Sequence, residues 1–194
     1  MNNQDLTQFD VLNLYKSGSS VYTYKEALDN DYIVIVSNSI QSLQILTEKN
    51  NYNIYDVNTF NQLLSDHEPS SLECFFLQKE HILKEEIKLN FVLDLTKLRN
   101  SFSKKASNSW VKAKKKLLIE KDYDLLIAQK SLFHSLRILD FAIDIAKNGK
   151  ITDYNQSNHL WQKIKDLKTW DELHKEFKET YNSKKTILRS LCPK

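Results

Sequence analysis

The sequence predicts an α+β fold in which a small mixed sheet with flanking helices is followed by a C-terminal helical bundle. Three observations lead to this prediction. Short β-branched and aromatic segments lie before residue 60, helical periodicity runs almost without interruption from Asp94 onward, and only 2 of the 194 residues are glycine. Because glycine-lined phosphate loops and turn-rich barrels need many positive φ angles, the scarcity of glycine excludes both.

Three segments predict strands. They are residues 11–16 (VLNLYK), 31–36 (DYIVIV) and 52–57 (YNIYDV). The second segment is β-branched and almost continuously apolar, which is typical of a strand buried on both faces. A turn over residues 17–20 (SGSS) follows the first strand.

The apolar residues change to helical spacing after residue 57. One helix is expected around residues 60–64. A second is expected after Pro69, where Ser70 and Glu73 have the spacing of a capping box. That spacing favours a capping role for Glu73 over a catalytic one.

The remainder of the chain predicts a bundle of longer helices, over residues 95–119, 123–148, 154–167 and 170–188. Gly149 is expected to end the second of these, and Thr169 with Glu172 to form the capping box of the last. We therefore expect an α/β domain over residues 1–95 and a helical domain over residues 96–194.

The cysteine content and the apolar segments of the sequence indicate the cellular compartment in which the protein works. Cys74 and Cys192 are too few for a disulfide framework or a cysteine-built zinc site, which favours a reducing environment. The first ten residues carry acids and amides where a signal peptide would carry basic and then apolar residues. No apolar run approaches the roughly 20 residues that span a bilayer. We therefore expect a cytoplasmic protein without a membrane partner.

The two halves differ sharply in charge. Residues 1–95 hold 6 Lys/Arg and 14 Asp/Glu, whereas residues 96–194 hold 22 and 11. Two interpretations remain open. The halves are solvated surfaces that attract each other, or an acidic metal-holding half accompanies a basic half that receives phosphates.

The residues with the clearest chemical pattern are Gly18, Ser19, Asp29 and Asp31. A Gly-Ser turn follows a strand, and two aspartates spaced two apart begin the next strand. Strand alternation places such aspartates on one face, where they can hold divalent metal ions, and Gly18 allows phosphate oxygens to approach the backbone closely. Taken separately, the first pair is typical of an ordinary turn and the second of a solvated strand edge.

This order of motifs resembles the DNA polymerase β superfamily of nucleotidyltransferases. The similarity continues through a branch of predicted stand-alone members with a helical C-terminal region, and it covers residues 12 to 180. It is carried further by Tyr55–Phe60, Leu63, Leu64, Pro69, Leu72, Glu73, Lys130, His134–Arg137 and Gly149–Ile151. Thr23 and Leu28 depart from the pattern, which often has glycine and serine at these positions.

The resemblance implies a nucleotidyltransferase-type sheet and nucleotidyl transfer with Mg²⁺ or Mn²⁺ held by Asp29 and Asp31. It also implies a third catalytic carboxylate on a neighbouring strand. Asp56 is the only acid in the segment 52–57, so it is the candidate, whereas the aligned position falls nearer Asn51 or Asn53.

The predicted helix 123–148 carries a cationic face. Lys130, His134 and Arg137 have spacings of 4 and 3 residues, which place them together in an otherwise apolar helix. They could pair internally with Asp140 or Asp144. The resemblance favours the other interpretation, in which these three residues bind the triphosphate of a nucleotide together with the Gly18-Ser19 turn.

A second basic helical face contains Lys105, Asn108, Lys112 and Lys115 or Lys116, with Trp110 among them. Such a face is most often simply solvated, and it is also typical of a surface that follows a nucleic-acid backbone. No interleaved aromatic RNA-binding signature accompanies it. An RNA acceptor is therefore one option among several.

The sequence as a whole predicts a metal-dependent nucleotidyltransferase that moves a nucleoside monophosphate from an NTP, most simply ATP, to an acceptor hydroxyl. The acceptor is open between an RNA, a protein and a small hydroxylated molecule, and the oligomeric state is open as well. One alternative is a catalytically degenerate nucleotide-binding module of a regulatory, antitoxin-like kind. Another is a helical RNA-binding protein whose acidic half is structural.

Overall fold

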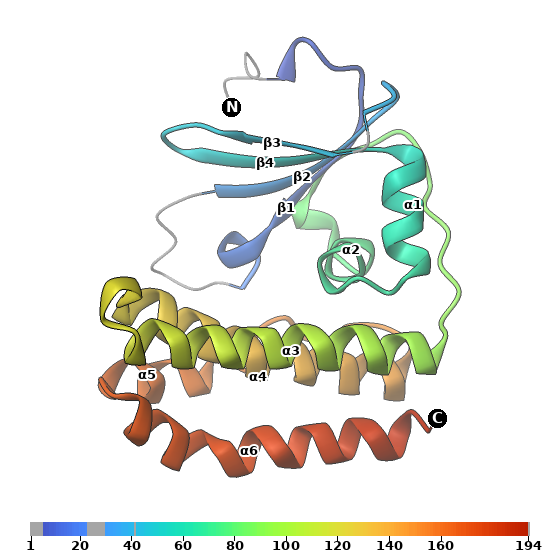
Figure 1. Cartoon of the computed structure of the whole chain (residues 1–194). Helices are drawn as coiled ribbons and strands as arrows, with labels where there is room; N and C mark the ends of the chain where they lie inside the picture. Colours follow the sequence, from blue (N-terminus) through green and yellow to red (C-terminus); the bar gives the residue numbers. More distant parts are fainter. Residues whose placement is uncertain (1–5, 23–29, 41, 194) are drawn as a thin grey trace. The chain divides into compact units, whose positions relative to one another are not determined.

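The computed structural model describes residues 6–22, 30–40 and 42–193. The chain forms two compact units, Met1–Val92 and Leu93–Lys194. The first unit contains the sheet and the second is helical (Figure 1). The α+β class predicted from the sequence is confirmed. Among the described helices, none is both long enough and apolar enough to cross a membrane.

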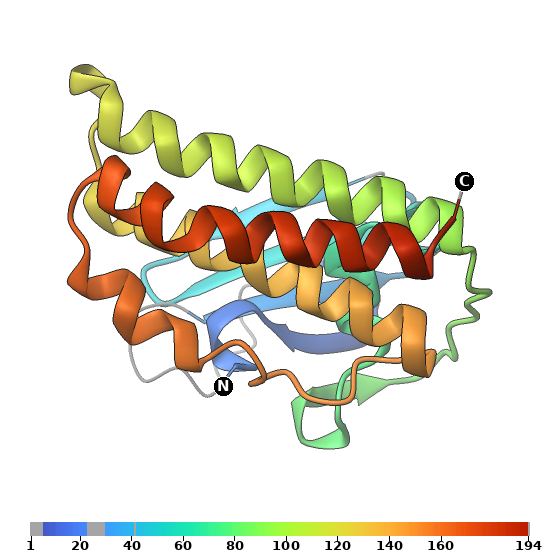
Figure 2. The ribbon, with the colours of Figure 1, turned by 90° about the horizontal axis from the view of Figure 1, so that it is seen from below.

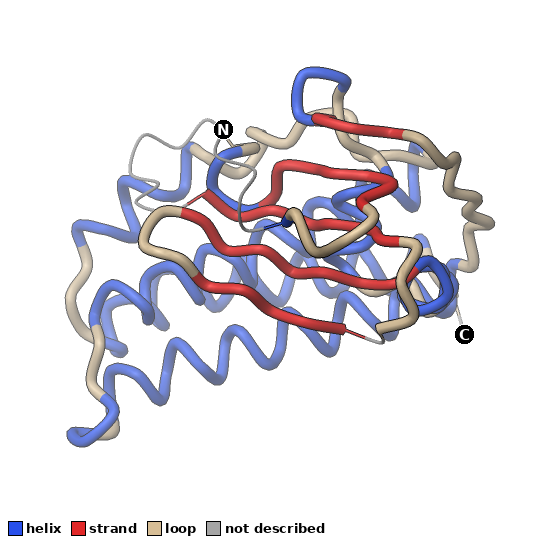
Figure 3. The backbone as a smooth tube through the Cα atoms, turned by 90° about the horizontal axis from the view of Figure 1, so that it is seen from above, coloured by secondary structure: helices blue, strands red, loops and turns tan. Residues whose placement is uncertain are grey.

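The described strands of the first unit form one mixed five-stranded sheet with the order β3-β4-β2-β1-β5 (Figure 3). The strands are β1 (Val11–Ser17), β2 (Asn30–Val36), β3 (Ser42–Leu46), β4 (Asn50–Asp56) and β5 (Ile82–Glu85). Strand β2 runs parallel to β4, and the other neighbouring pairs are antiparallel. The sequence predicts β1, β2 and β4 but not the edge strands, because β3 is largely exposed and β5 is only four residues long.

The core of the first unit follows the alternation of β2. Ile33, Val34, Ile35 and Val36 are all buried, so the prediction of a strand covered on both faces is confirmed. One face carries a cluster formed by Leu6, Leu14, Tyr32, Val34, Val36, Tyr52 and Ile54. Residues at odd positions of β2 and β4, among them Asp31 and Asn51, belong to the opposite face.

Two helices follow β4, namely α1 (Val57–Ser65) and α2 (Pro69–Phe75). Pro69 occupies the first turn of α2, where its missing N–H has no intrahelical acceptor to lose. The predicted capping box of Ser70 and Glu73 is wrong, because the side chain of Glu68 caps α2 by accepting from the backbone N–H groups of Ser70 and Ser71.

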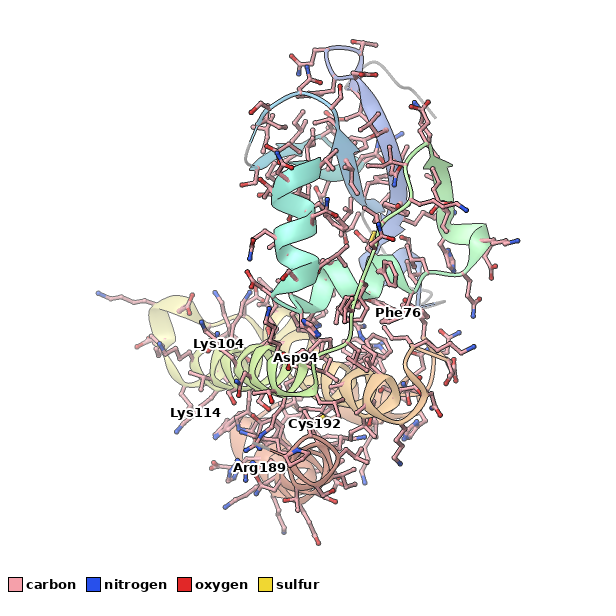
Figure 4. The ribbon with its side chains drawn as sticks, turned by 90° about the vertical axis from the view of Figure 1, so that its right-hand side faces the viewer. Phe76, Asp94, Lys104, Lys114, Arg189 and Cys192 are labelled. Carbon is pink, nitrogen blue, oxygen red and sulfur yellow. The ribbon has the colours of Figure 1, made fainter. Side chains whose placement is uncertain are left out.

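The second unit consists of α3 (Leu95–Leu118), α4 (Leu125–Asn148), α5 (His159–Asp166) and α6 (Trp170–Leu191) (Figure 2). Asp94, which is labelled in Figure 4, is the N-cap of α3. Gly149 ends α4 at a φ of 71°, and Thr169 with Glu172 forms the capping box of α6. Both predictions are confirmed. Helix α5 is shorter than expected and begins at His159, since turns replace the first residues of the predicted range.

Candidate functional site

Asp31 lies between two polar neighbours at the beginning of β2. It is opposite Ser17 in the antiparallel register with β1 and opposite Asn51 in the parallel register with β4. The Asn51 side-chain amide donates a hydrogen bond of 2.9 Å to Oδ1 of Asp31. The carboxylate of Asp31 is therefore oriented by the neighbouring strand.

Gly18 directly adjoins the other oxygen of the same carboxylate. It opens a 3-10 turn over Gly18–Ser20 and has a φ of 62°. A Cβ built on Gly18 would lie 2.5 Å from Oδ2 of Asp31 and 3.2 Å from its Cγ. Any other residue at position 18 would both strain the backbone and displace the Asp31 side chain.

This contact changes the interpretation of the glycine. From the sequence, Gly18 is expected to let phosphate oxygens approach the backbone. The structure gives a further reason, which is that only glycine leaves room for the carboxylate of Asp31. Ser19, the other residue of the predicted phosphate-binding turn, lies in the same 3-10 turn.

The Gly18–Ser20 turn is anchored by bonds on both sides. The Ser20 hydroxyl donates to the carbonyl of Ser17 at 2.8 Å, and the Val21 N–H donates to the carbonyl of Gly18 at 3.1 Å. The buried Tyr22 then donates its hydroxyl proton to the Glu73 carboxylate on α2. Glu73 thus connects α2 to the chain after the turn, a role that spacing alone does not indicate.

Asp29, the other predicted metal ligand, lies outside the described residues. Within the described part of the chain, no three His, Cys, Asp or Glu side chains converge as metal ligands. The position beside Asp31 on the neighbouring strand is held by Asn51, an amide. The described site therefore contains one oriented carboxylate and one amide.

Asp56 is not brought to this site. In the β2–β4 register Asn51 is opposite Asp31, whereas Asp56 is opposite Val36, five residues further along the strand. At about 3.3 Å per residue this separates the two backbone positions by about 16 Å. Asp56 instead caps α1, accepting from the Thr59 N–H at 2.6 Å, and the Thr59 backbone and side-chain hydrogen bonds lower the pKa of its carboxyl group. The structure thus gives Asp56 a capping role and does not group it with Asp31.

Lys130, His134 and Arg137 lie on α4 in the second unit, whereas Gly18, Ser19 and Asp31 belong to the first. Lys130 is exposed and Arg137 is buried. The guanidinium of Arg137 lies over two aromatic rings of its own helix, those of Phe133 at 5.4 Å and Phe141 at 5.9 Å. These cation–π contacts stabilise a buried positive charge.

Asp140 and Asp144, the internal partners considered from the sequence, are engaged elsewhere. Asp140 forms an ion pair with Lys184 of α6 and accepts from the Ser157 hydroxyl. Asp144 accepts from the backbone and hydroxyl of Thr152. These carboxylates therefore hold α6 and the segment after Gly149 against α4.

A groove of about 550 Å³ runs between α3 and α4. It is lined from α3 by Lys105, Asn108, Ser109 and Lys112, and from α4 by Ile127, Lys130, Ser131 and His134. The sequence places Lys105, Asn108 and Lys112 on one helical face, and Lys130 and His134 on another. It does not predict that these two faces meet, because the pairing of helices depends on tertiary packing.

His134 is a neutral side chain in this groove. Burial, together with the positive charges of Arg137, Lys105 and Lys112, lowers the pKa of His134 from 6.5 to about 3. Nη2 of Arg137 lies 3.3 Å from Nδ1 of His134. Because arginine only donates, Nδ1 accepts and the imidazole proton resides on Nε2.

Comparisons with known proteins identify no family for this chain. No protein-family model and no curated protein matches it. Among solved structures, it is similar to a nucleotidyltransferase-like protein from Exiguobacterium sibiricum 255-15. The sequence identity is 11%, the match covers 97% of this chain and 72% of the other, and the TM-score is 0.36.

Proposed function

We propose that this protein binds a nucleoside triphosphate, most simply ATP, and transfers its nucleoside monophosphate to an acceptor hydroxyl. The observation that supports this proposal is the close approach of Gly18 to the Asp31 carboxylate. A positive-φ glycine turn placed against an oriented carboxylate combines a backbone segment open to phosphate oxygens with a ligand for a divalent cation.

The side chains near the turn fit Mg²⁺ in type. Mg²⁺ is commonly bound through one or two carboxylates together with substrate phosphates, and it keeps several waters. Asp31 supplies one such carboxylate, and Asp29 is proposed as the second. When bound there, Mg²⁺ or Mn²⁺ would neutralise charge on the phosphates and on the leaving pyrophosphate.

In the proposed reaction the oxygen of an acceptor hydroxyl attacks the α-phosphorus. The new O–P bond forms as the bond from the α-phosphorus to the bridging oxygen breaks, the proton of the hydroxyl passes to solvent water, and pyrophosphate leaves. The contribution of the chain is positioning. Gly18 and Ser19 bind phosphate oxygens, and Asn51 holds the carboxylate of Asp31 in a fixed orientation.

A second candidate function is nucleotide binding without turnover, as in a regulatory, antitoxin-like module. It is favoured by one observation, the amide of Asn51 directly opposite Asp31. An amide oxygen can bind a metal ion but brings no negative charge. A site with an amide at this position would hold a second cation weakly while still binding the nucleotide.

The decisive experiment incubates the full chain with α-³²P-labelled ATP, Mg²⁺ or Mn²⁺, and a cell extract that supplies acceptors. We expect a labelled product that disappears with Asp31→Asn and persists with Asp66→Asn. Asp66 is a matched control because it is an exposed aspartate of the same unit, bonded to Gln62 and not opposite Asn51.

The outcomes separate the two candidates. Calorimetric binding of ATP that requires Asp31, without label transfer to any acceptor, favours the regulatory module. Label transfer that survives the double change Asp29→Asn and Asp31→Asn contradicts the proposed transferase. Absence of ATP binding by the wild-type chain contradicts both candidates.

A further inference from the structure

The groove between α3 and α4 collects positive charge from both helices. Lys105 and Lys112 line it from α3, and Lys130 lines it from α4. All three lysines are exposed residues. No carboxylate is found among the described residues that line the groove.

Two of these lysines form no ion pair with any described residue. In the described part of the chain neither Lys112 nor Lys130 forms an ion pair, although Lys116 one turn further along α3 pairs with Asp122. Like charges that face one another across a groove repel, and an anion between them would remove that repulsion.

His134 adds a neutral donor to the same groove. Its Nδ1 accepts from Arg137, which leaves the N–H at Nε2. Polar neighbours complete the lining, with Asn108 on α3 and Ser131 on α4. Amide, hydroxyl and imidazole donors beside ammonium groups form a lining suited to oxyanions.

Charged side chains of α3 affect the pKa of His134 on α4. The positive charges of Lys105 and Lys112 contribute to the low pKa of His134, after burial and Arg137. This influence agrees with the shared lining of the groove, in which lysines of α3 lie beside His134 and Lys130 of α4.

We propose that the α3–α4 groove binds a linear polyphosphate chain, with Lys105, Lys112 and Lys130 contacting phosphoryl oxygens and Nε2–H of His134 donating to one of them. The chain is either free polyphosphate or the triphosphate of a nucleotide. This inference rests on the geometry of the second unit and not on chemistry at Asp31.

The lining favours a polyphosphate over a nucleic-acid strand. Sequence-tolerant binding of single-stranded RNA relies on aromatic side chains on which bases stack. Among the described residues that line the groove none is aromatic, and Ile127 is the one aliphatic side chain. The charged residues of α3 span about 10 Å along the helix axis from Lys105 to Lys112, which suits a short, densely charged chain.

The test measures calorimetric binding of inorganic triphosphate to the full chain. The variant Lys112→Gln with Lys130→Gln should weaken binding by about tenfold or more, since each charge-assisted contact contributes appreciably. The matched control is Lys104→Gln with Lys114→Gln, which removes the same charge from exposed α3 positions outside the groove (Figure 4). It should change the affinity by less than about threefold.

Further binding measurements distinguish a nucleotide from free polyphosphate as the ligand. Tighter binding of ATP than of inorganic triphosphate, again reduced in the groove variant, assigns the site to a nucleotide. Equal binding of the two assigns it to the polyphosphate chain itself. In either case binding of inorganic triphosphate should survive Asp31→Asn, which separates this inference from the proposed transferase.

Three binding results overturn the proposal. They are absence of triphosphate binding by the wild-type chain, equal weakening of binding by the Lys112/Lys130 and Lys104/Lys114 double variants, and binding of a single-stranded oligoribonucleotide without binding of triphosphate. A direct readout is the long-range ¹H–¹⁵N spectrum of the imidazole. The Nε2 signal of His134 should shift when triphosphate is added, and an unchanged signal would also count against the proposal.

Discussion

Gly18 and Asp31 are in contact across the start of β2, and a Cβ on the glycine would lie 2.5 Å from Oδ2 of the aspartate. The other carboxylate oxygen accepts from Asn51 at 2.9 Å. The carboxylate is thus held between a backbone with no side chain and an amide from the parallel strand β4. Its orientation depends on residues from β2, β4 and the turn after β1.

Replacement of Gly18 by alanine should therefore reduce both stability and ligand binding. The chain offers a matched control in Gly149→Ala, since Gly149 also has a positive φ but no atom lies within 4 Å of its added Cβ. The control should show only left-handed backbone strain, about 1–2 kcal/mol in urea unfolding. Gly18→Ala should lower the unfolding free energy by more than Gly149→Ala does, and it should also weaken ATP binding.

A double-mutant cycle assigns the excess to the carboxylate. In an Asp31→Ala background, the unfolding free energies of Gly18→Ala and Gly149→Ala should differ by less, because the carboxylate oxygen that clashes with the added Cβ is gone. An unchanged difference would mean that Asp31 is not what position 18 accommodates.

Asn51→Asp should convert the site into a carboxylate pair. Without metal, the lost hydrogen bond and the repulsion of Asp31 should lower the unfolding free energy by about 1–3 kcal/mol. With Mg²⁺ or Mn²⁺ the same variant should regain thermal stability, because two carboxylates bind a divalent cation better than one.

Asn53→Asp is the control for this change. Asn53 lies two residues further on the same face of β4 but is opposite Ile33, so its carboxylate would not meet Asp31. The measurement is thermal unfolding with a chelator and with added Mg²⁺. If Mg²⁺ raises the melting temperatures of Asn51→Asp and Asn53→Asp equally, position 51 does not form a cation site with Asp31.

Asp56→Ser separates capping from catalysis. Serine is a good N-cap but carries no carboxylate, so α1 should keep its cap and label transfer should persist, whereas Asp56→Ala should lower the melting temperature. The hydrogen bonds from Thr59 lower the pKa of Asp56, so its stabilising effect is present above the ordinary value of 3.8 and is lost as the pH falls through the folded pKa. Loss of transfer in a fully stable Asp56→Ser protein would instead assign the carboxylate a catalytic role.

His134 should make the protein less stable in mild acid. Its folded pKa of about 3 is below the ordinary value of 6.5, so between these values the unfolded chain binds a proton that the folded chain does not. The unfolding free energy should therefore fall as the pH is lowered from about 6.5, by up to about 1.4 kcal/mol per pH unit for this group.

The measurement is urea unfolding from pH 7 to pH 5 for the wild type and for His134→Gln, which keeps an acceptor for Arg137. The variant should lose less stability than the wild type over this range. His159→Gln, at an exposed position on α5, should follow the wild type. Parallel profiles for the wild type and His134→Gln would contradict the neutral state of this imidazole.

The helices and central strands were predictable because their signals are local. The unbroken apolar run of β2, the glycine after α4 and the Thr169–Glu172 capping box each act within a few residues. The cap of α2 was misassigned because Glu68 and Glu73 both suit a helix start, and the hydroxyl of Tyr22, 51 residues before Glu73, engages the latter. Such a long-range bond leaves no local pattern.

The candidate sites were predictable in part. Spacing alone places Lys105 with Lys112 and Lys130 with His134, but the meeting of these two faces is a property of helix packing. In the sheet, the acid available on the third predicted strand was Asp56, and the strand register decides that Asn51 is the residue opposite Asp31. A five-residue difference in register is about 16 Å, more than any side chain spans.

The sequence by itself determined the α+β class, the buried β2, the long helices and the sharp division of charge between the two halves. Those features follow from hydrophobic period, capping and composition, which act over short distances along the chain. Only the tertiary structure decided why position 18 is glycine, which residue faces Asp31, and where the lysines of α3 meet those of α4. These relationships depend on strand register and helix packing, which join residues that no local pattern connects.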